Sequence, residues 1–347
     1  MAADSSSIAG GDWWQPFELR FDVHPKFLRP RPGEEVIDRI NSVEDTKGNN
    51  GMRGSLCMTN LRIMWTSHRS DRVNLSIGYS TIQTITIRTT DSRLRGGRTQ
   101  ALFLMTRMGK KRYEFIFTSL VKASPRMFTT VQAVFRAYET SKLFRDLRLR
   151  GAIIKDGALI HLPDEEVYLQ QGGVMNLSAE QGNLGTLFIT NIRMVWHADL
   201  AENFNVSIPY LQMTGIGLRE SRFGKALVLT TTPRSGNYTL GFKVEPDEKL
   251  TEVFRAVQAM HTTFAARPVF GVKYTIENQP APLAARTVSR VTEDVEIIEG
   301  EETTDSFAAY LAAASAEPDR PLVFDEGLGL AMEQLPAGMT VAKLWKV

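Results

Sequence analysis

Hydrophobic and polar residues alternate along the first third of the chain in short runs bounded by turn residues. In residues 112–119, Tyr113, Phe115 and Phe117 fall on one face and Glu114 and Thr118 on the other, which is typical of a half-buried strand. Similar runs occupy residues 34–40, 54–59, 62–67, 73–79, 81–88 and 101–107. The pattern predicts about seven strands joined as successive hairpins.

After these strands the period lengthens to that of a helix. Ser124 is the expected N-cap and Pro125 the expected first helical residue, and apolar residues then recur at helical spacing: Met127, Phe128, Val131, Val134, Phe135 and Tyr138. Pro246, Asp247 and Glu248 begin a second predicted helix. Its apolar stripe comprises Leu250, Val253, Phe254, Val257, His261 and Phe264.

The sequence repeats itself at an offset of 131 residues. Residues 32–85 align without a gap with residues 163–216, and 17 of the 54 aligned positions are identical. TNLRIMW at 59–65 matches TNIRMVW at 190–196, and NLSIGY at 74–79 matches NVSIPY at 205–210. The two copies are therefore expected to share one fold. Later the offset falls to 125, so the first copy carries extra residues in a basic loop.

Seven short antiparallel strands closed by one amphipathic helix indicate the pleckstrin-homology-like (PH-like) fold. In that fold a strongly bent sheet leaves one corner open, and the helix fills it. A Greek-key sandwich is the alternative, but it gives no reason for the terminal helix. The predicted fold class is β-rich α+β, with two tandem PH-like domains and a C-terminal extension.

Charge is distributed unevenly although the net charge is only +2. Residues 1–150 hold 25 Lys and Arg against 14 Asp and Glu, residues 151–270 hold 10 against 12, and residues 271–347 hold 6 against 13. The first segment at +11 is expected to attract an anionic partner: membrane headgroups, nucleic acid or an acidic protein face. Charge alone does not choose among them.

The single cysteine, Cys57, excludes an internal disulfide and favours the reducing, cytosolic side of a membrane. The first residues lack the apolar core of a secretory signal, and no apolar run approaches the ~20 residues of a spanning helix. Any membrane role is expected to be peripheral.

The last part of the chain reads as an acidic linker followed by a short apolar tail. Seven acidic residues fall within residues 293–305. This stretch is expected to be a solvated tether, although it could also shield the basic domain. The apolar residues beyond it are expected to dock on a partner subunit or on the chain's own domains, and the candidate contacts are Phe324, Leu328, Leu330, Leu335 and Trp345.

Several long motifs resemble the Bardet-Biedl syndrome protein five family. They are EDTKGNNG at 44–51, AYETSKLFRDLRLR at 137–150, QGNLGTLFITNIRMVWHA at 181–198, FNVSIPYLQ at 204–212 and FGVKY at 270–274. The resemblance runs from about residue 17 to the end of the chain. It implies two tandem PH-like domains, which we place at 17–150 and 151–268, followed by an extension at 269–347. The acidic linker, at about 278–306 from its composition, does not match the family clearly.

This resemblance also carries expectations about function. The family is a subunit of the BBSome, a coat-like complex of ciliary membrane-protein traffic. The resemblance implies partners with β-propeller and helical-repeat folds, phosphoinositide binding, and localisation at the cilium, its basal body and the cytoplasm. It implies no catalysis. No cofactor is expected, and nucleic acid is not the expected partner of the basic domain, because no aromatic residues for base stacking are interleaved with the arginines.

The residues themselves give no catalytic constellation. The five histidines are scattered, and neither HExxH nor Cys-x-x-Cys occurs. The glycine-rich segment 48–54 lacks the lysine of a P-loop, so its glycines are expected to serve a turn with positive φ. Cys57 and His197 are expected to be structural. A lipid-modifying enzyme would need a nucleophile or metal site that this sequence lacks.

The twice-repeated Thr-Asn-x-Arg-x-x-Trp is interpreted as a folding motif. Thr-Asn suits a tight turn, the tryptophan an inner sheet face, and the arginine a pair across strands. Function is therefore sought where the two copies differ.

The copies differ most in basic loop residues. Lys47, Arg53, Arg69 and Arg72 align with Ser178, Leu184, Leu200 and Asn203. Strand parity places loops 42–53, 68–72 and 90–100 at one rim of the first sheet. That rim gathers Lys47, Arg53, Arg69, Arg72, Arg93, Arg95 and Arg98. A second candidate cluster, Lys110, Lys111 and Arg112, is expected at the opposite end unless the sheet bends.

Guanidinium groups on neighbouring loops can chelate the phosphates of a phosphoinositide headgroup. Lipid binding is one hypothesis for the rim; an acidic docking face on a partner subunit is the other. Residues 140–150 are expected to continue the first helix and to bunch Lys142, Arg145, Arg148 and Arg150. The second copy, which lacks the rim charges, is expected to dock proteins.

Overall fold

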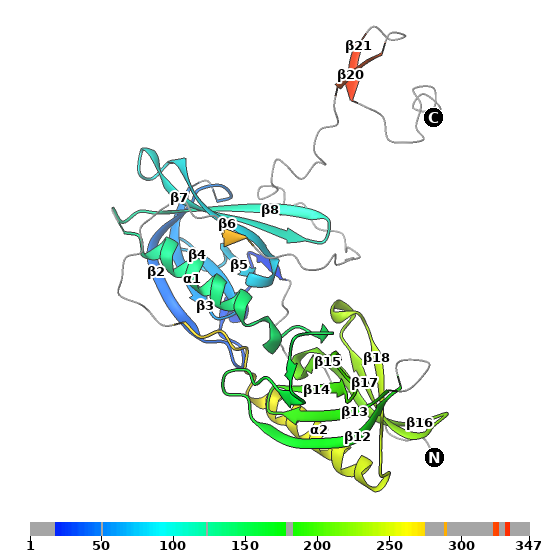
Figure 1. Cartoon of the computed structure of the whole chain (residues 1–347). Coiled ribbons are helices and arrows are strands. Elements are labelled where there is room, and N and C mark those ends of the chain that lie inside the picture. Colours follow the sequence, from blue (N-terminus) through cyan, green and yellow to red (C-terminus); the bar gives the residue numbers. More distant parts are fainter. Residues whose placement is uncertain are drawn as a thin grey trace.

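The computed structural model describes residues 18–49, 51–122, 124–177 and 183–274, and the backbone of three short strands at 288–289, 322–325 and 330–333. Figure 1 shows two β-rich units, each with one long helix, joined through a short connecting segment. No helix in these ranges is long and apolar enough to cross a bilayer.

In the first unit a bent antiparallel sheet is closed by a helix. Its strands are β1 (Leu19–Phe21), β2 (Val36–Asp45), β3 (Met52–Thr59), β4 (Arg62–Ser67), β5 (Asn74–Gly78), β6 (Ile82–Ser92), β7 (Gly97–Met108) and β8 (Lys111–Ser119). Together with β19 (Val288–Ser289) they form a nine-stranded sheet in the order β1-β5-β4-β3-β2-β8-β7-β6-β19. Helix α1 (Arg126–Thr140) buries the predicted apolar stripe in the same core as the strands.

The second unit repeats this arrangement. Its eight-stranded sheet has the order β16-β17-β18-β12-β13-β14-β15-β9. The strands are β9 (Arg148–Leu149), β12 (Val167–Asn176), β13 (Asn183–Thr190), β14 (Arg193–Ala198), β15 (Ala201–Pro209), β16 (Met213–Ser221), β17 (Gly224–Thr231) and β18 (Thr239–Val244). Helix α2 (Glu248–Ala266) packs on it, and a small hairpin of β10 (Ile154–Lys155) and β11 (Ala158–Leu159) precedes β12.

The predicted fold is confirmed. Strands β2–β8 are the predicted strands of the first copy, and β12–β18 are their equivalents in the second. The additional strands β1, β9 and β19 have only two or three residues and pair at sheet edges. Such segments are too short to show a period.

The repeated motif builds the same buried structure in both units. The indole of Trp65 donates to the carbonyl of Val43 at 3.1 Å, and that of Trp196 donates to the carbonyl of Val174 at 2.9 Å. The interpretation as a folding motif is therefore confirmed.

The arginine of this motif forms a buried ion pair. Arg62 Nε lies 2.8 Å from Glu34, and Arg193 Nε lies 2.7 Å from Glu165. Each glutamate precedes the first long strand of its unit, so the main partner is not on an adjacent strand as predicted. The hydroxyl of Ser76 on the neighbouring strand β5 accepts only a further hydrogen bond, at 3.2 Å.

Two local predictions are wrong at the first helix. The N-cap is Pro125 and not Ser124, and no side chain caps the helix there. The helix also does not continue through residues 140–150. It ends at Thr140, a short 3-10 turn follows at Lys142–Phe144, and Arg145 is fully buried while Arg148 lies in β9. The expected basic bunch therefore does not form.

The segment that leaves the second unit packs back on the first. Phe270 is 3% exposed and belongs to the core of the first unit. The buried guanidinium of Arg145 donates to the carbonyl of Phe270 at 2.7 Å and lies 3.8 Å from the centroid of the Tyr138 ring. Gln212 of the second unit donates to the carbonyl of Arg145 at 2.6 Å. Arg145 therefore joins both units.

The C-terminal candidates fall largely outside the described residues. Phe324 lies in β20 (Leu322–Asp325) and Leu330 in β21 (Leu330–Glu333), which pair as an antiparallel hairpin. Leu328, Leu335 and Trp345 lie outside the residues that the structure describes. Within the predicted linker, Val288 and Ser289 pair with Ile85 and Thr84 of β6. That part of the linker is a strand, not a plain tether.

Candidate anion-binding rim

Three loops meet at one end of the first unit, as strand parity predicts. The backbone N–H of His68, after β4, donates to the carbonyl of Arg53 at 3.0 Å. The conformation of the β2–β3 loop is set partly by Gly51, whose φ is +70°. A Cβ on Gly51 would lie 3.2 Å from the Cβ of Arg93, so this loop touches the β6–β7 turn. We call this end, with Lys47, Arg53, Arg69, Arg72, Arg93, Arg95 and Arg98, the basic rim.

Two buried carboxylates hold two of the three loops of the basic rim in place. Glu44 accepts hydrogen bonds from the hydroxyl of Ser92 and from the backbone N–H of Arg93, the latter at 3.0 Å. Asp45 accepts from the backbone N–H of Gly48 at 3.2 Å and from the side-chain amide of Asn49 at 2.7 Å. Both carboxylates are fully buried at the base of a cluster of cations. Their hydrogen bonds fix the loops from beneath.

The basic residues of the rim are not equivalent. Among the described residues, Arg53, Arg69, Arg72 and Arg98 are exposed and form no ion pair, although Arg53 donates to the hydroxyl of Ser42. These four guanidinium groups can reach an external anion. Two further cations have structural partners.

Lys47 and Arg95 have those structural partners. The ammonium of Lys47 lies 2.8 Å from the carboxylate of Glu114, and Arg95 donates to Thr99 at 3.0 Å and to the carbonyl of Ser119 at 3.3 Å. These two side chains shape the rim more than they extend its reach.

The second candidate cluster lies at the other end of β7, as predicted. Strand β7 runs from the β6–β7 turn to the β7–β8 turn, where Lys110, Lys111 and Arg112 are all exposed. Arg107, which the sequence reasoning did not single out, is directly opposite Arg112 in the ladder. Because side chains of opposite residues in a ladder lie close together, this turn is more basic than its three predicted residues indicate.

At the rim of the second unit, the equivalents of Arg53, Arg69 and Arg72 are uncharged or apolar, whereas the β16–β17 turn keeps the exposed Arg222 and Lys225. Leu184 is 51% exposed, and Leu200, in the β14–β15 turn, is fully exposed. Ser178 lies outside the described residues. The buried carboxylates have also gone, because Met175 and Asn176 occupy the positions of Glu44 and Asp45. The cations of the β2–β3 and β4–β5 loops and the two buried acids are thus lost together.

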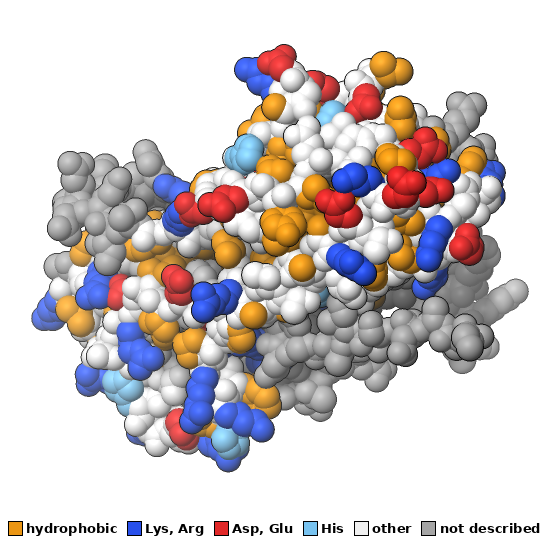
Figure 2. All heavy atoms as spheres, turned by 90° about the horizontal axis from the view of Figure 1, so that it is seen from below, with side chains coloured by type: hydrophobic (Ala, Val, Ile, Leu, Met, Phe, Trp, Pro, Cys, Tyr) orange, Lys and Arg blue, Asp and Glu red, His pale blue; other side chains and the backbone are white. Residues whose placement is uncertain are grey.

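Figure 2 shows that charge is distributed unevenly on one face of the molecule. Lys and Arg side chains predominate at the lower left, whereas acidic, basic and hydrophobic side chains are mixed at the upper right.

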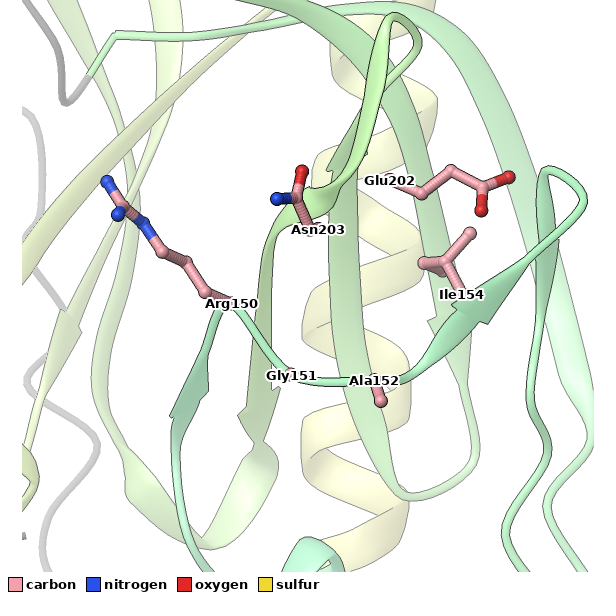
Figure 3. A pocket seen from close by; sticks show the side chains of 6 residues that line it. All are labelled: Arg150, Gly151, Ala152, Ile154, Glu202 and Asn203. Carbon is pink, nitrogen blue, oxygen red and sulfur yellow. The ribbon is translucent and has the colours of Figure 1, made fainter. Parts of the chain in front are cut away.

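A shallow depression of about 500 Å³ lies in the second unit where the chain enters it. Its lining residues come from the segment before β10, from the first residue of β10 and from β15: Arg150, Gly151, Ala152, Ile154, Glu202 and Asn203. In Figure 3 the side chains of Arg150 and Glu202 point away from each other. The guanidinium of Arg150 lies 5.7 Å from the ring centroid of Phe204. Polar groups do not converge here as a catalytic site requires.

The titratable groups predicted to be structural are buried. Burial raises the pKa of the Cys57 thiol, which makes it a poor nucleophile. His197 is 4% exposed and stacks on Phe188 with ring centroids 5.8 Å apart. In the described ranges no group of three or more His, Cys, Asp or Glu side chains could hold a metal ion.

Sequence reasoning missed Glu44 as the residue that links two loops of the basic rim. The sequence does show that Glu44 is an acidic residue in a strand where the second copy has methionine. Strand parity alone, however, does not place Glu44 near Ser92. The bend of the sheet brings the two together.

Two family models match the chain. Residues 34–140 match the Bardet-Biedl syndrome 5 protein N-terminal PH-like domain, and residues 148–274 match the second PH-like domain of the same protein. The mouse and human proteins named BBSome complex member BBS5 are each 52% identical over 96% of this chain and 97% of their own length. A Caenorhabditis elegans protein, BBSome complex member bbs-5, is 40% identical over 98% of both chains.

Proposed function

Because this chain belongs to the Bardet-Biedl syndrome 5 protein family, we propose that it is a non-enzymatic subunit of the BBSome that reads anionic membrane lipid with its first PH-like domain. The second domain and the tail bind other subunits, which are β-propeller and helical-repeat proteins. The subunit acts in ciliary membrane-protein traffic. It works peripherally on the cytosolic face of membranes at the cilium and its basal body, and it is also present in the cytoplasm.

The observation that best supports lipid binding is the contrast between the equivalent rims of two domains that share one fold. The first rim presents exposed arginines on three loops, two of which are ordered by buried carboxylates, whereas the equivalent positions of the second domain hold Leu184, Leu200 and Asn203. A compact polyanion such as a phosphoinositide headgroup can be chelated by guanidinium groups from neighbouring loops. Each basic group near an anionic leaflet contributes about 1 kcal/mol, so the rim is sufficient for salt-sensitive membrane binding.

The three exposed arginines without ion pairs on the β2–β3 and β4–β5 side provide the test. Arg53→Glu, Arg69→Glu and Arg72→Glu together should reduce binding to phosphoinositide-containing vesicles by at least about a hundredfold, since removing three contacts of ~1 kcal/mol already accounts for that factor. The measurement is sedimentation of the purified chain with vesicles at fixed ionic strength.

A matched control applies the same change of charge to the second domain. Arg219, Arg222 and Lys225 are exposed around the β16–β17 turn, and their reversal to glutamate also changes the net charge by six units. Vesicle binding should persist in this control. Equal loss in both variants, or no loss in the first, would contradict the rim.

The alternative for the rim is an acidic face of a partner subunit. In that case the first variant would keep its vesicle binding and lose recovery with the complex. The rim variant should assemble normally if the rim faces lipid.

A further inference from the structure

The two sheets differ in how their edges are covered. In the first domain, β1 pairs with β5 at one edge and β19 pairs with β6 at the other. In the second domain, β9 pairs with β15. In the ranges that the structure describes, no strand pairs with the outer side of β16. An edge strand left in this way presents a row of backbone donors and acceptors to any extended chain.

The open edge is the structural equivalent of the edge that β19 covers. In the first domain, Val288 pairs with Ile85 and Ser289 pairs with Thr84, in antiparallel orientation. At the offset of 131 residues, Thr84 and Ile85 of β6 correspond to Gly215 and Ile216 of β16. The fold has therefore already accepted an added strand at this position once.

The pairing register shows which backbone groups of β16 face outward. Strands β16 and β17 are joined by the loop Arg222–Phe223, so Ser221 and Gly224 form the hydrogen-bonded pair next to the loop. Alternation along the ladder makes Gly217 and Val228 a hydrogen-bonded pair as well. The N–H and C=O groups of Ile216, Leu218 and Glu220 then point away from β17.

The segment Gly215–Leu218 of this edge lacks the features that usually protect exposed strands. Charged side chains, prolines and bulges commonly block such edges. Strand β16 contains no proline, and its first charged residue is Arg219. Its one irregularity lies before Gly215, and a Cβ on Gly217 would meet no atom within 4 Å. The side chains of Ile216 and Leu218 pack against the core of the second domain.

We propose that the outer edge of β16 binds an extended segment of another BBSome subunit as an antiparallel strand centred on Gly215–Leu218. This inference rests on the proposed membership of the complex. The occupant comes from a partner because the other short strands described beyond the second domain are already paired: β19 with β6, and β20 with β21. Main-chain hydrogen bonds supply affinity in this mode, and alternate side chains of the added strand supply specificity.

Hydrogen exchange of the full chain, free and in the assembled complex, tests the proposal. The amides of Ile216, Leu218 and Glu220 should exchange rapidly in the free chain and at least about tenfold more slowly in the complex, because pairing suppresses local opening. The amides of Gly217 and Arg219 point toward β17 and should be protected in both states, so they serve as internal controls. Unchanged exchange at the three outward amides in a fully assembled complex would overturn the proposal while leaving membership intact.

Two other occupants give distinct results. Protection already present in the free chain at high dilution would mean that the chain covers its own edge. Protection that rises with the concentration of the free chain would mean a second copy. Either outcome overturns the proposal, whereas failure of the wild-type chain to join the complex would refute the proposed function itself.

A pair of substitutions tests the edge by a second route. Leu218→Pro removes an outward N–H and adds a ring at the edge, and edge strands tolerate proline when that N–H faces solvent. Leu218→Val shortens the side chain similarly but keeps the N–H. Retention in the complex should fall about tenfold for the proline variant relative to the valine variant, which equals the loss of one or two hydrogen bonds. Equal retention, with native circular dichroism for both, would overturn the proposal.

Discussion

The two domains have nearly the same interior and different exteriors. Both bury an Arg-Glu pair and a tryptophan that donates to a strand carbonyl, at equivalent positions. At their rims, by contrast, arginines in one domain correspond to Leu184, Leu200 and Asn203 in the other. Residues kept in both copies thus maintain the fold, and residues that differ carry what distinguishes the domains.

The difference extends to one buried layer. Glu44 and Asp45 cost free energy to bury, and they are present only beneath the basic rim. In the second domain Met175 and Asn176 take these positions. Glu44 and Asp45 are present beneath the basic rim and absent where its loop arginines are absent, so we infer that these buried acids serve the rim.

The shared interior should give the largest effects, and equal ones. Glu34→Ala and Glu165→Ala each leave a buried guanidinium without its carboxylate, so each should lower the free energy of unfolding of its domain by about 3–5 kcal/mol. Chemical denaturation of the full chain, followed by the fluorescence of the domain tryptophans, measures this loss.

An exposed ion pair provides the control for that experiment. The Lys249–Glu252 pair on α2 is about half exposed, and Lys249→Ala should change stability by less than about 1 kcal/mol. A large loss in one domain and a negligible loss in the other would break the equivalence of the two interiors.

Transfer of the rim charges should give an effect of intermediate size. Leu184→Arg, Leu200→Arg and Asn203→Arg place guanidinium groups at the equivalents of Arg53, Arg69 and Arg72. Three contacts of ~1 kcal/mol predict a gain in vesicle binding of up to about a hundredfold. Sedimentation with anionic vesicles, in the background of the glutamate-substituted first rim, isolates the second domain.

A smaller gain from this transfer is informative in its own right. If adding Met175→Glu to the three arginines raises the binding further, the buried carboxylate orders the loops of a rim. No binding at all from the transferred arginines would show that the rim needs features beyond charge.

The smallest expected effect is a pH dependence confined to the second domain. Burial lowers the pKa of His261 below its usual 6.5, and a hydrogen bond to the Met213 backbone, which favours the protonated imidazole, acts in the opposite direction. The unfolded chain therefore binds more protons than the folded domain as the pH falls through 6.5. Stability of the second domain is then lost below that pH.

The first domain has no histidine beside the equivalent tyrosine. Tyr79 packs against Phe135 and Tyr138, whereas its counterpart Tyr210 packs against His261 and Phe264. Thermal unfolding between pH 7.5 and pH 5.5 should shift for the second domain only, and His261→Phe should flatten the dependence. An equal shift in that variant would assign it to other groups.

The sequence predicts the fold well because the hydrophobic patterns of the strands and helices extend over long segments in both copies. The repeat also shows the same order of elements twice. All six residues of the predicted α1 stripe are buried: Met127, Phe128, Val131, Val134, Phe135 and Tyr138. The grouping of the rim loops also followed from strand parity. Glu34 could not be identified as the partner of Arg62, because nothing local connects residues 28 positions apart.

The same limit applies to the edges and the junction. Strands of two or three residues carry no period, so β9 and β19 were not predicted. Arg145 looked like one of several surface cations in a basic stretch, yet it is buried between the domains. Its role depends on Phe270, which lies 125 positions away in the chain.

Because Phe270, which follows the second domain, packs in the core of the first, it holds the two domains together. Gly271 packs so closely against Phe144 that a Cβ would lie 2.2 Å from its ring, and Lys273 pairs with Asp164 across the same junction. A membrane that orients the basic rim would thereby also set the direction in which the β16 edge is offered. The orientation of the β16 edge, and not only the distance to a neighbouring subunit, would then decide which subunit can bind the protein on a bilayer.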